Sequence, residues 1–252
     1  MRIDVPEAVH LPQLLSLWKT AFGDYDGFWE RFLEGDFDPA CCRCLLLDGQ
    51  VSAALYWFPC SFRGQKIAYI YAVATAPSLR GQGLCRTLLA ATHRHLTALG
   101  FHSAMLVPES EDLRRMYRRM GYRDCTTVTE FSCSAANAAI ALRPVSVQEY
   151  GSLRKMLLPP GSVLQEGSNL SFLGAQAELL AGENCLLAVY LEDGILHAVE
   201  YLGDRDLAPS IVRSLGCETG QFRMPGTERP FAMIFPLAKD AAVPDYFGLA
   251  FD

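Results

Sequence analysis

The sequence predicts an α+β fold built on a mixed sheet, and three observations lead to this prediction. Three β-rich runs, at residues 44–47, 51–58 and 66–74, follow one another with only tight turns between them. The third run enters a glycine-rich turn and then an amphipathic helix. The order then continues strand, helix, strand, whereas a simple alternation of strands and helices would indicate a doubly wound sheet.

The composition is that of a folded, acidic protein of one large or two small domains. Of the 252 residues, 50% are apolar and 20% are charged, which is ample for a buried core. The formal net charge is −6, so we expect no nucleic-acid partner, which would require a basic face. No apolar run reaches ~18 residues and no signal core is present, so we expect no membrane span and a cytoplasmic location.

Apolar spacing and turn residues place the elements of the first half. The turns are predicted at Asp48-Gly49 and Arg63-Gly64. His93 and His95 fall on the helix after the glycine-rich turn, and we expect them on its surface. Helices are expected over 10–22, 25–33, 84–99 and 111–120, and further strands over 101–107 and 122–132.

The second half repeats this order faintly. After a featureless stretch, 132–141, we expect helices over 147–157, 169–180 and 207–215, a hairpin over 185–191 and 195–202, and strands over 220–224, 231–235 and 246–251. Between hairpin and helix stands Gly203-Asp204-Arg205-Asp206, whose two carboxylates would repel an anion. The second half is therefore predicted to be a degenerate copy without a phosphate loop.

The stretch YIYAVATAPSLRGQGLCRTLL, residues 69–89, carries the strongest functional signal. Its glycines allow close approach to the backbone, and the first N–H groups of the following helix have no acceptor inside that helix. Such a helix end favours a bound anion. An ordinary turn is the competing interpretation. The stretch is neither a Walker loop, because no Gly-Lys-Ser/Thr follows, nor a dinucleotide fingerprint, because a third glycine is missing.

Arg80-Gly81-Gln82-Gly83 after V-A-T-A-P is similar to the coenzyme A loop of the GNAT family of N-acetyltransferases. L-V-P-E-S at 106–110 and Y-R-R-M-G-Y at 117–122 resemble two further segments of that family. Together the motifs most resemble the branch named for enhanced intracellular survival, over about Pro6 to Phe131. The resemblance implies the acyl-CoA N-acyltransferase fold, a GNAT domain over 1–134 with acetyl-CoA as donor, and a degenerate GNAT-like domain over 141–252.

The resemblance also implies a set of coenzyme contacts and no metal. Backbone groups of three strand residues would pair with the pantetheine arm and the thioester: Ala72, Val73 and Ala74. The pyrophosphate would lie on the loop: Arg80, Gly81, Gln82, Gly83, Leu84 and Cys85. Cys85 departs from the Gly or Ala usual there. Ser110 either caps the next helix or contacts the coenzyme arm.

Two residues are expected to move protons. Tyr117 occupies the position of the family's usual acid and would protonate the leaving thiolate; an aromatic packed at a helix end is the alternative. The base is expected to be Asp252, because in the survival-type branch the chain's own C-terminal carboxylate lies in the active site. The other candidates for the base are Glu30, Glu109 and Glu111.

Aromatic residues and cysteines admit simpler interpretations. The helix pair at the start would line the acceptor cleft, so Tyr25, Phe28 and Trp29 either face substrate or pack in the core. Cys41 and Cys44 form a CxxC among nine cysteines, but no second pair or ligand histidine stands near. We therefore expect buried or incidental thiols rather than a metal or redox site.

The sequence thus predicts an N-acetyltransferase that moves an acetyl group from acetyl-CoA to a primary amine of a small molecule. The alternative is a non-catalytic acyl-CoA-binding sensor or scaffold, and a third interpretation is transfer of a longer acyl group. Exposed strands of the second half could pair in a homodimer.

Overall fold

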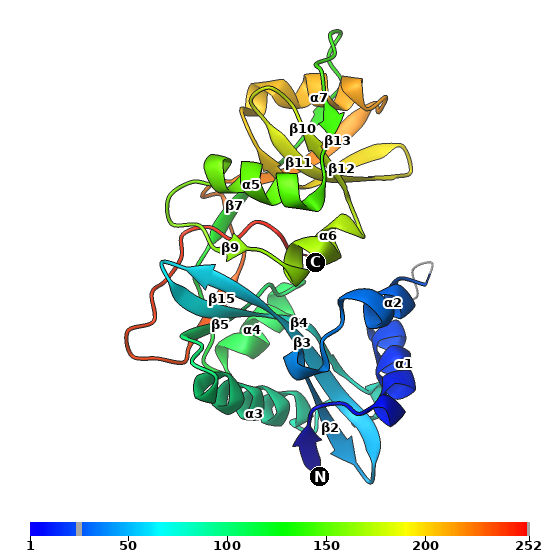
Figure 1. The fold of residues 1–252 in the computed structure, drawn as a ribbon, viewed down its shortest axis with the longest axis vertical. Coiled ribbons are helices and arrows are strands. Elements are labelled where there is room, and N and C mark those ends of the chain that lie inside the picture. Colours follow the sequence, from blue (N-terminus) through cyan, green and yellow to red (C-terminus); the bar gives the residue numbers. More distant parts are fainter. Residues whose placement is uncertain (24–26, 251–252) are drawn as a thin grey trace. The chain divides into compact units, whose positions relative to one another are not determined.

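A computed structural model describes residues 1–23 and 27–250, and their contacts divide into two units (Figure 1). Unit 1 comprises Met1–Leu106, Arg119–Gly121 and Phe235–Ala242, and unit 2 comprises Val107–Arg118, Tyr122–Ile234 and residues 243–250. The expected boundary between 134 and 141 does not coincide with this division. The units are interleaved in sequence, because Val107–Arg118 belongs to unit 2 while the segments on either side of it belong to unit 1.

Unit 1 is built on a sheet whose strands lie in the order β1 (Arg2–Asp4), β2 (Cys42–Leu47), β3 (Gln50–Phe62), β4 (Gln65–Thr75) and β5 (Ser103–Leu106). Neighbours are antiparallel except β4 and β5, which are parallel. Both predicted hairpin turns form with positive φ at each central residue: 50° and 80° at Asp48-Gly49, and 49° and 77° at Arg63-Gly64. These angles match the turn that follows the twist of paired strands.

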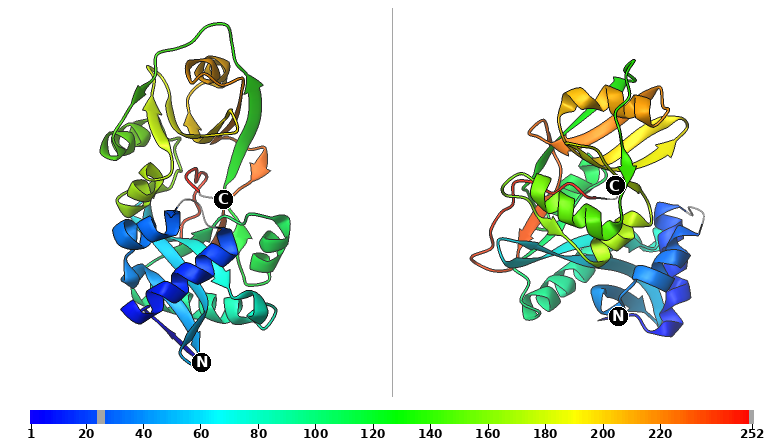
Figure 2. Two further views of the ribbon diagram at one scale, coloured as in Figure 1. Left: turned by 90° about the vertical axis from the view of Figure 1, so that its right-hand side faces the viewer. Right: turned by 45° about the horizontal axis from the view of Figure 1, so that its top comes forward.

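Helices cover both faces of this sheet (Figure 2). They are α1 (Leu11–Phe22), α2 (Phe28–Arg31), which continues as a π-helical turn over Phe32–Asp36, and α3 (Leu84–Ala98). Because side chains alternate along a strand, Tyr56 meets Phe32 on one face, whereas Trp57 meets His95 of α3 on the other. The prediction that His93 lies on the surface is wrong, since it is buried and stacks on Phe235 with ring centroids 4.1 Å apart.

Unit 2 contains a second mixed sheet, ordered β14 (Arg229–Pro230), β7 (Thr127–Ser134), β13 (Thr219–Pro225), β12 (Ile195–Leu202), β11 (Leu186–Glu192), β10 (Glu178–Ala181) and β8 (Arg143–Pro144). Only β12 and β13 run parallel. The strand expected over 122–132 is divided: β6 (Arg123–Asp124) pairs with β15 (Met233–Pro236), and β7 joins the second sheet. The fold class, a mixed α/β molecule with two sheets, is confirmed.

The helices of unit 2 are α4 (Glu111–Arg118), α5 (Val147–Leu157), α6 (Ser168–Gly174) and α7 (Ala208–Ser214), and β9 (Leu164–Gln165) is a short extended segment. Two predictions for this half are wrong. The helix expected over 169–180 ends at Gly174, because residues 178–181 pair with β11 and β8. The strand expected over 246–251 does not form in residues 246–250, which have only an isolated bridge between Tyr246 and Ser162. Within the described residues, no helix is both long and apolar enough to span a membrane.

Candidate functional site

The strand before the glycine-rich loop carries a bulge. Ala54 pairs with Ala74 and Tyr56 with Tyr71, so Leu55 faces two residues of β4, Ala72 and Val73. The two-against-one count defines a β-bulge, a feature common beside active sites. Ala72 has φ of +50°, a conformation that costs a non-glycine residue roughly 1–2 kcal/mol.

A buried hydrogen bond fixes this bulge. The indole Nε1 of Trp18, on α1, donates to the carbonyl oxygen of Ala72 at 3.1 Å, and Trp18 is 0% exposed. The carbonyl oxygen of Ala72 therefore already accepts one hydrogen bond from within the protein, and a ligand would share it with Trp18. The sequence did not reveal that Trp18 would reach this atom.

β4 leaves its parallel neighbour before it reaches the bulge. The ladder between β4 and β5 runs from Ile67↔Ser103 to Tyr69↔Met105, while β4 continues to Thr75. Residues 70–75 thus have no β5 partner in this ladder. An open strand edge of this kind can pair with an extended ligand as it would with another strand. Val73 and Ala74, two of the residues expected to pair with the coenzyme arm, lie in this stretch.

The glycine-rich loop leads into α3 without a capping side chain. Gly81 and Gly83 have φ of +78° and +79°, and a Cβ added at either would meet no atom within 4 Å. Gly83 is the N-cap: its carbonyl accepts from Thr87 N at 3.0 Å, and no side chain caps the helix among the residues that the structure describes. The first N–H groups of α3, at Leu84 and Cys85, have no acceptor inside the helix, so the open space beside the loop suits an anion.

The charged groups of the loop are also compatible with a phosphate. Arg80 is exposed and its Nε donates to the carbonyl oxygen of Thr75 at 3.2 Å, which holds its side chain near the strand end. Gln82 and Arg86 are exposed as well. Burial raises the pKa of the Cys85 thiol to about 11, so this residue adds bulk to the loop but no negative charge at neutral pH.

Tyr117 and Ser110 belong to unit 2. Ser110 begins α4: its hydroxyl oxygen accepts from Leu113 N at 3.3 Å, which is the capping role considered from the sequence. Tyr117 is 6% exposed and packs edge-on against Tyr122, with ring centroids 5.7 Å apart. A buried ring of this kind fits both roles considered from the sequence, packing at the helix end and proton donation.

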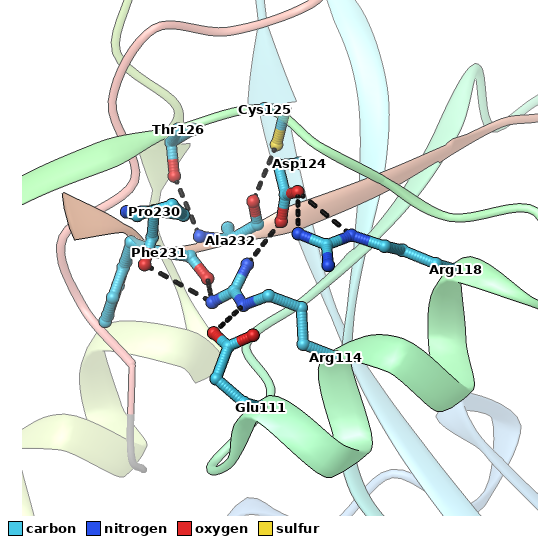
Figure 3. Close-up of polar contacts among 9 residues, drawn as sticks. All are labelled: Glu111, Arg114, Arg118, Asp124, Cys125, Thr126, Pro230, Phe231 and Ala232. Carbon is cyan, nitrogen blue, oxygen red and sulfur yellow. Dashed lines mark hydrogen bonds and ion pairs between the residues drawn. The ribbon is translucent and has the colours of Figure 1, made fainter.

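An arginine on α4 connects that helix to a distant segment of the chain (Figure 3). The guanidinium of Arg114 donates to Asp124 Oδ1 at 2.5 Å and to the carbonyl oxygens of Phe231 and Pro230 at 2.9 and 3.3 Å. Its Nε also lies 3.1 Å from Glu111 Oε1. Arg114 is 4% exposed, so its charge is buried with its partners.

The candidate bases have different surroundings. Asp252 lies outside the described residues. Glu30 Oε1 lies 2.5 Å from Lys19 Nζ, and Glu111 pairs with Arg114, so both carboxylates form ion pairs. Glu109 is exposed.

The aromatic residues of the first helices are also placed in part. Trp29 is 2% exposed and its Nε1 donates to the carbonyl oxygen of Gly23 at 3.0 Å, so it packs in the core. Phe28 is half-buried against Trp29, with ring centroids 4.8 Å apart. Tyr25 lies outside the described residues.

The cysteine group near the start of β2 is chemically quiet. Burial raises the pKa of Cys41 and Cys44 to about 11, and the pKa of Cys42 well above its usual value. Neutral thiols are poor nucleophiles and poor metal ligands. Across the described part of the chain, no three His, Cys, Asp or Glu residues form a group that could hold a metal ion.

Comparison with known proteins identifies the first half of the chain. Residues 3–125 match the family model described as acetyltransferase (GNAT) domain. Residues 3–125 are a GNAT domain. No curated protein gives a significant match to the chain by sequence.

Solved GNAT structures share the fold over nearly the whole chain. A GCN5-related N-acetyltransferase from Anabaena variabilis has a TM-score of 0.74 at 14% identity, covering 94% of this chain and 73% of that one. Eis1 from Mycobacterium abscessus, a survival-type protein, has a TM-score of 0.66 at 12% identity over the same shares. A tandem GNAT protein from the clavulanic acid biosynthesis pathway has a TM-score of 0.58 at 10% identity, covering 95% of this chain and all of that one. These similarities support a second GNAT-like domain in the fold.

The sequence indicated the glycine-rich loop of the GNAT domain, but not the long-range contacts that fix the bulge in β4 and the position of α4. The bulge at Ala72 depends on Trp18, which is 54 residues away in sequence, and the anchor of α4 depends on Phe231, which is 117 residues from Arg114. The one available signal was Arg114 itself, a charged residue at the helical spacing of Tyr117, three positions before it.

Proposed function

We propose that the GNAT domain binds an acyl-CoA along residues 70–75 and the loop at Arg80–Cys85. One observation carries the proposal: β4 runs past the end of its ladder with β5 and leads to a helix whose first N–H groups face open space beside Gly81 and Gly83. An extended pantetheine arm with a diphosphate at one end matches an open strand edge followed by an anion site.

The reaction proposed is acetyl transfer from acetyl-CoA to a primary amine of a small molecule. The amine nitrogen attacks the thioester carbonyl carbon, a C–N bond forms, the C–S bond breaks, the amine loses a proton and the thiolate gains one. Tyr117 is proposed to supply the proton to sulfur. A phenol near pKa ~10 and a thiol near ~8.5 differ by about 2 kcal/mol in water, a gap that a tuned site can close.

Removal of the amine proton is the second step that needs a residue. Freeing a lysine-like amine at pH 7 costs about 4.6 kcal/mol, so a base must take part directly or through water. We keep Asp252 as the proposed base, since Glu30 and Glu111 already form ion pairs. A chain without residues 251–252 should then remain folded and lose turnover, and wild-type rates would reject this role.

Coenzyme binding is tested by isothermal titration with acetyl-CoA and with free CoA. Gly83→Asp should abolish binding, because it places a carboxylate where the diphosphate is expected and strains a residue with φ of +79°. Gly64→Asp is the matched control: Gly64 has φ of +77° with equally open surroundings, in a hairpin turn. Equal losses of coenzyme binding in both variants would mean that backbone strain alone causes the effect. Unchanged binding in Gly83→Asp would reject the site.

A thiol-release assay against a panel of amines separates an enzyme from a binder. The alternative is a non-catalytic acyl-CoA-binding protein, and the ion pairs of Glu30 and Glu111 leave Asp252 and the exposed Glu109 as the candidates for a base. Binding without thiol release from any acyl-CoA would support that alternative. Release with acetyl-CoA, lost in Tyr117→Phe while coenzyme affinity is kept, would support the transferase.

A further inference from the structure

The helix that carries Tyr117 is too short to hold its own position. α4 has eight residues, and isolated helices of that length are unstable in water. Only two of its residues are buried, Arg114 and Tyr117, and their spacing of three puts them on one face. The contacts of Arg114 therefore help to hold α4, and with it Tyr117, whose ring also packs against Tyr122.

Asp124 joins the two arginines that flank Tyr117 (Figure 3). Its Oδ1 accepts from Arg114 Nη1 at 2.5 Å, and its Oδ2 accepts from Arg118 Nη2 at 2.5 Å and from Nε at 3.2 Å. One carboxylate thus fastens the helix at positions −3 and +1 relative to the tyrosine. Burial opposes ionisation of Asp124, but the hydrogen bonds from Arg118 and Arg114 outweigh it and keep its pKa below the usual value.

The surface on which Arg114 rests is itself rigidly bonded. Cys125 N donates to the carbonyl oxygen of Ala232 at 3.0 Å, Phe231 N donates to the carbonyl oxygen of Thr126 at 2.8 Å, and Ala232 N donates to Thr126 Oγ1 at 3.0 Å. These bonds join residues 125–126 to residues 231–232, two segments that are far apart in sequence. Arg114 then adds its own bonds to the carbonyl oxygens of Pro230 and Phe231.

We infer that Arg114 and Asp124 are positioning residues for Tyr117, and that segment 230–232 of the second half serves the reaction through them. The inference rests on the proposed acid role of Tyr117. Arg114 suits this task because a planar guanidinium can hold a carboxylate and two carbonyl oxygens at once, whereas a lysine ammonium cannot reproduce that geometry. A shift of the tyrosine by about 1 Å costs up to about 100-fold in rate.

The test is a double-mutant cycle on thiol release with the full chain. Arg114→Lys should lower kcat about 10- to 100-fold and leave KM for acetyl-CoA within twofold. In a Tyr117→Phe background the same substitution should change kcat less than twofold, because its effect passes through the missing hydroxyl. Asp124→Asn, which keeps the shape of the side chain, should repeat the pattern. Arg115→Lys is the control, since Arg115 is exposed and pairs with Asp112.

Two kinetic outcomes would overturn the inference: unchanged kcat in both Arg114→Lys and Asp124→Asn, or an equal loss in the Tyr117→Phe background, which would indicate a general structural role. A measurement independent of turnover is the ¹⁹F resonance of 3-fluorotyrosine at position 117. It should shift in Arg114→Lys but not in Arg115→Lys, and an unshifted resonance would reject the inference. Failure of the proposed function would look different, since the wild-type chain would then release no thiol from any acyl-CoA.

Discussion

Each unit contains a strand, a helix and a parallel strand, and the two copies share geometric details. In unit 1 these are β4, α3 and β5; in unit 2 they are β12, α7 and β13. Each ladder stops before its first strand does, at Tyr69↔Met105 in one and at Ala198↔Phe222 in the other. Each first strand also carries a register shift past that point. The open strand edge is therefore a property of the topology and not by itself a ligand site.

The difference at the helix start lies in what meets its N–H groups. In unit 1 the N-cap is Gly83, with no capping side chain. In unit 2 a 3-10 turn, Arg205–Leu207, leads into α7, and the carboxylate of Asp204 caps that turn by accepting from Asp206 N at 3.0 Å, while Tyr201 OH donates to the carbonyl oxygen of Asp204. A second carboxylate, on Asp206, adds negative charge. We therefore expect an anion site in this topology only where the turn leaves its amides uncapped.

The difference on the strand is what fills the region past the bulge. In β4 the residues at and after the bulge, Ala72 to Ala74, have short uncharged side chains. In β12 the bulge at Val199 turns Glu200 away from the face on which Leu196 and Tyr201 pack in the core of the unit. Arg154, Tyr150 and Tyr246 then surround its carboxylate with four hydrogen bonds of 2.7–3.1 Å. In unit 2 the region beside the bulge is thus filled by the protein's own side chains.

Removing the charge of Glu200 should have the largest effect, because it disrupts the cluster that distinguishes unit 2 from unit 1. Glu200 is 0% exposed and Arg154 is 2% exposed, so Glu200→Gln leaves a buried guanidinium without a counter-charge. We expect a loss of about 3–5 kcal/mol in the free energy of unfolding, measured by urea denaturation at pH 7. Glu130→Gln is the control, because Glu130 is 36% exposed and its pairs with Arg223 and Arg229 should be worth less than ~1 kcal/mol. A loss of that smaller size in Glu200→Gln would show that the cluster does not hold unit 2 together.

Stability that depends on pH through a buried histidine should be a property of α3 and not of α7. His93 of α3 is 8% exposed, and burial lowers its pKa from 6.5 to about 4, whereas α7 contains no histidine. Between pH 6.5 and 4 the unfolded chain binds a proton that the folded chain does not, so the free energy of unfolding should fall by about 3 kcal/mol as the pH drops through that window. His93→Phe should flatten this dependence in urea denaturation at pH 7, 5.5 and 4. An equal pH slope in the variant would contradict the assignment.

What could be predicted from the sequence was local, and what could not was distant. Asp48-Gly49, Arg63-Gly64 and Asp193-Gly194 specify their turns through backbone angles that few other residues adopt, so the hairpins were predictable. The glycine-rich loop was found for the same reason. By contrast, β7 joins β13 of the second sheet, a pairing that no local pattern encodes.

The end of the chain shows a second limit of local prediction, where a predicted strand does not form. A strand was predicted over 246–251, but in residues 246–250 a side chain pairs with the backbone instead. The Gln165 amide donates to the carbonyl oxygen of Leu249 at 2.6 Å and accepts from Leu249 N at 3.3 Å, which replaces a strand partner. Gly248 could carry no side chain there, since an added Cβ would lie 2.1 Å from Glu200 Oε1. β-propensity describes how well a side chain fits a pleated surface and does not say whether a strand partner is present.

Removing the Asp204 cap should have the smallest effect on stability. It tests directly whether an uncapped turn is enough to bind an anion. Asp204→Ala frees Asp206 N and should cost about 1 kcal/mol of unfolding free energy. It should not create coenzyme affinity, because Asp206 keeps its carboxylate and Pro209 supplies no N–H at the start of α7. Titration of CoA into a double variant, Gly83→Asp with Asp204→Ala, should therefore give no heat. Heat from that variant would mean that an uncapped turn alone suffices, and that the acidic residues and the short helix are not what excludes the anion.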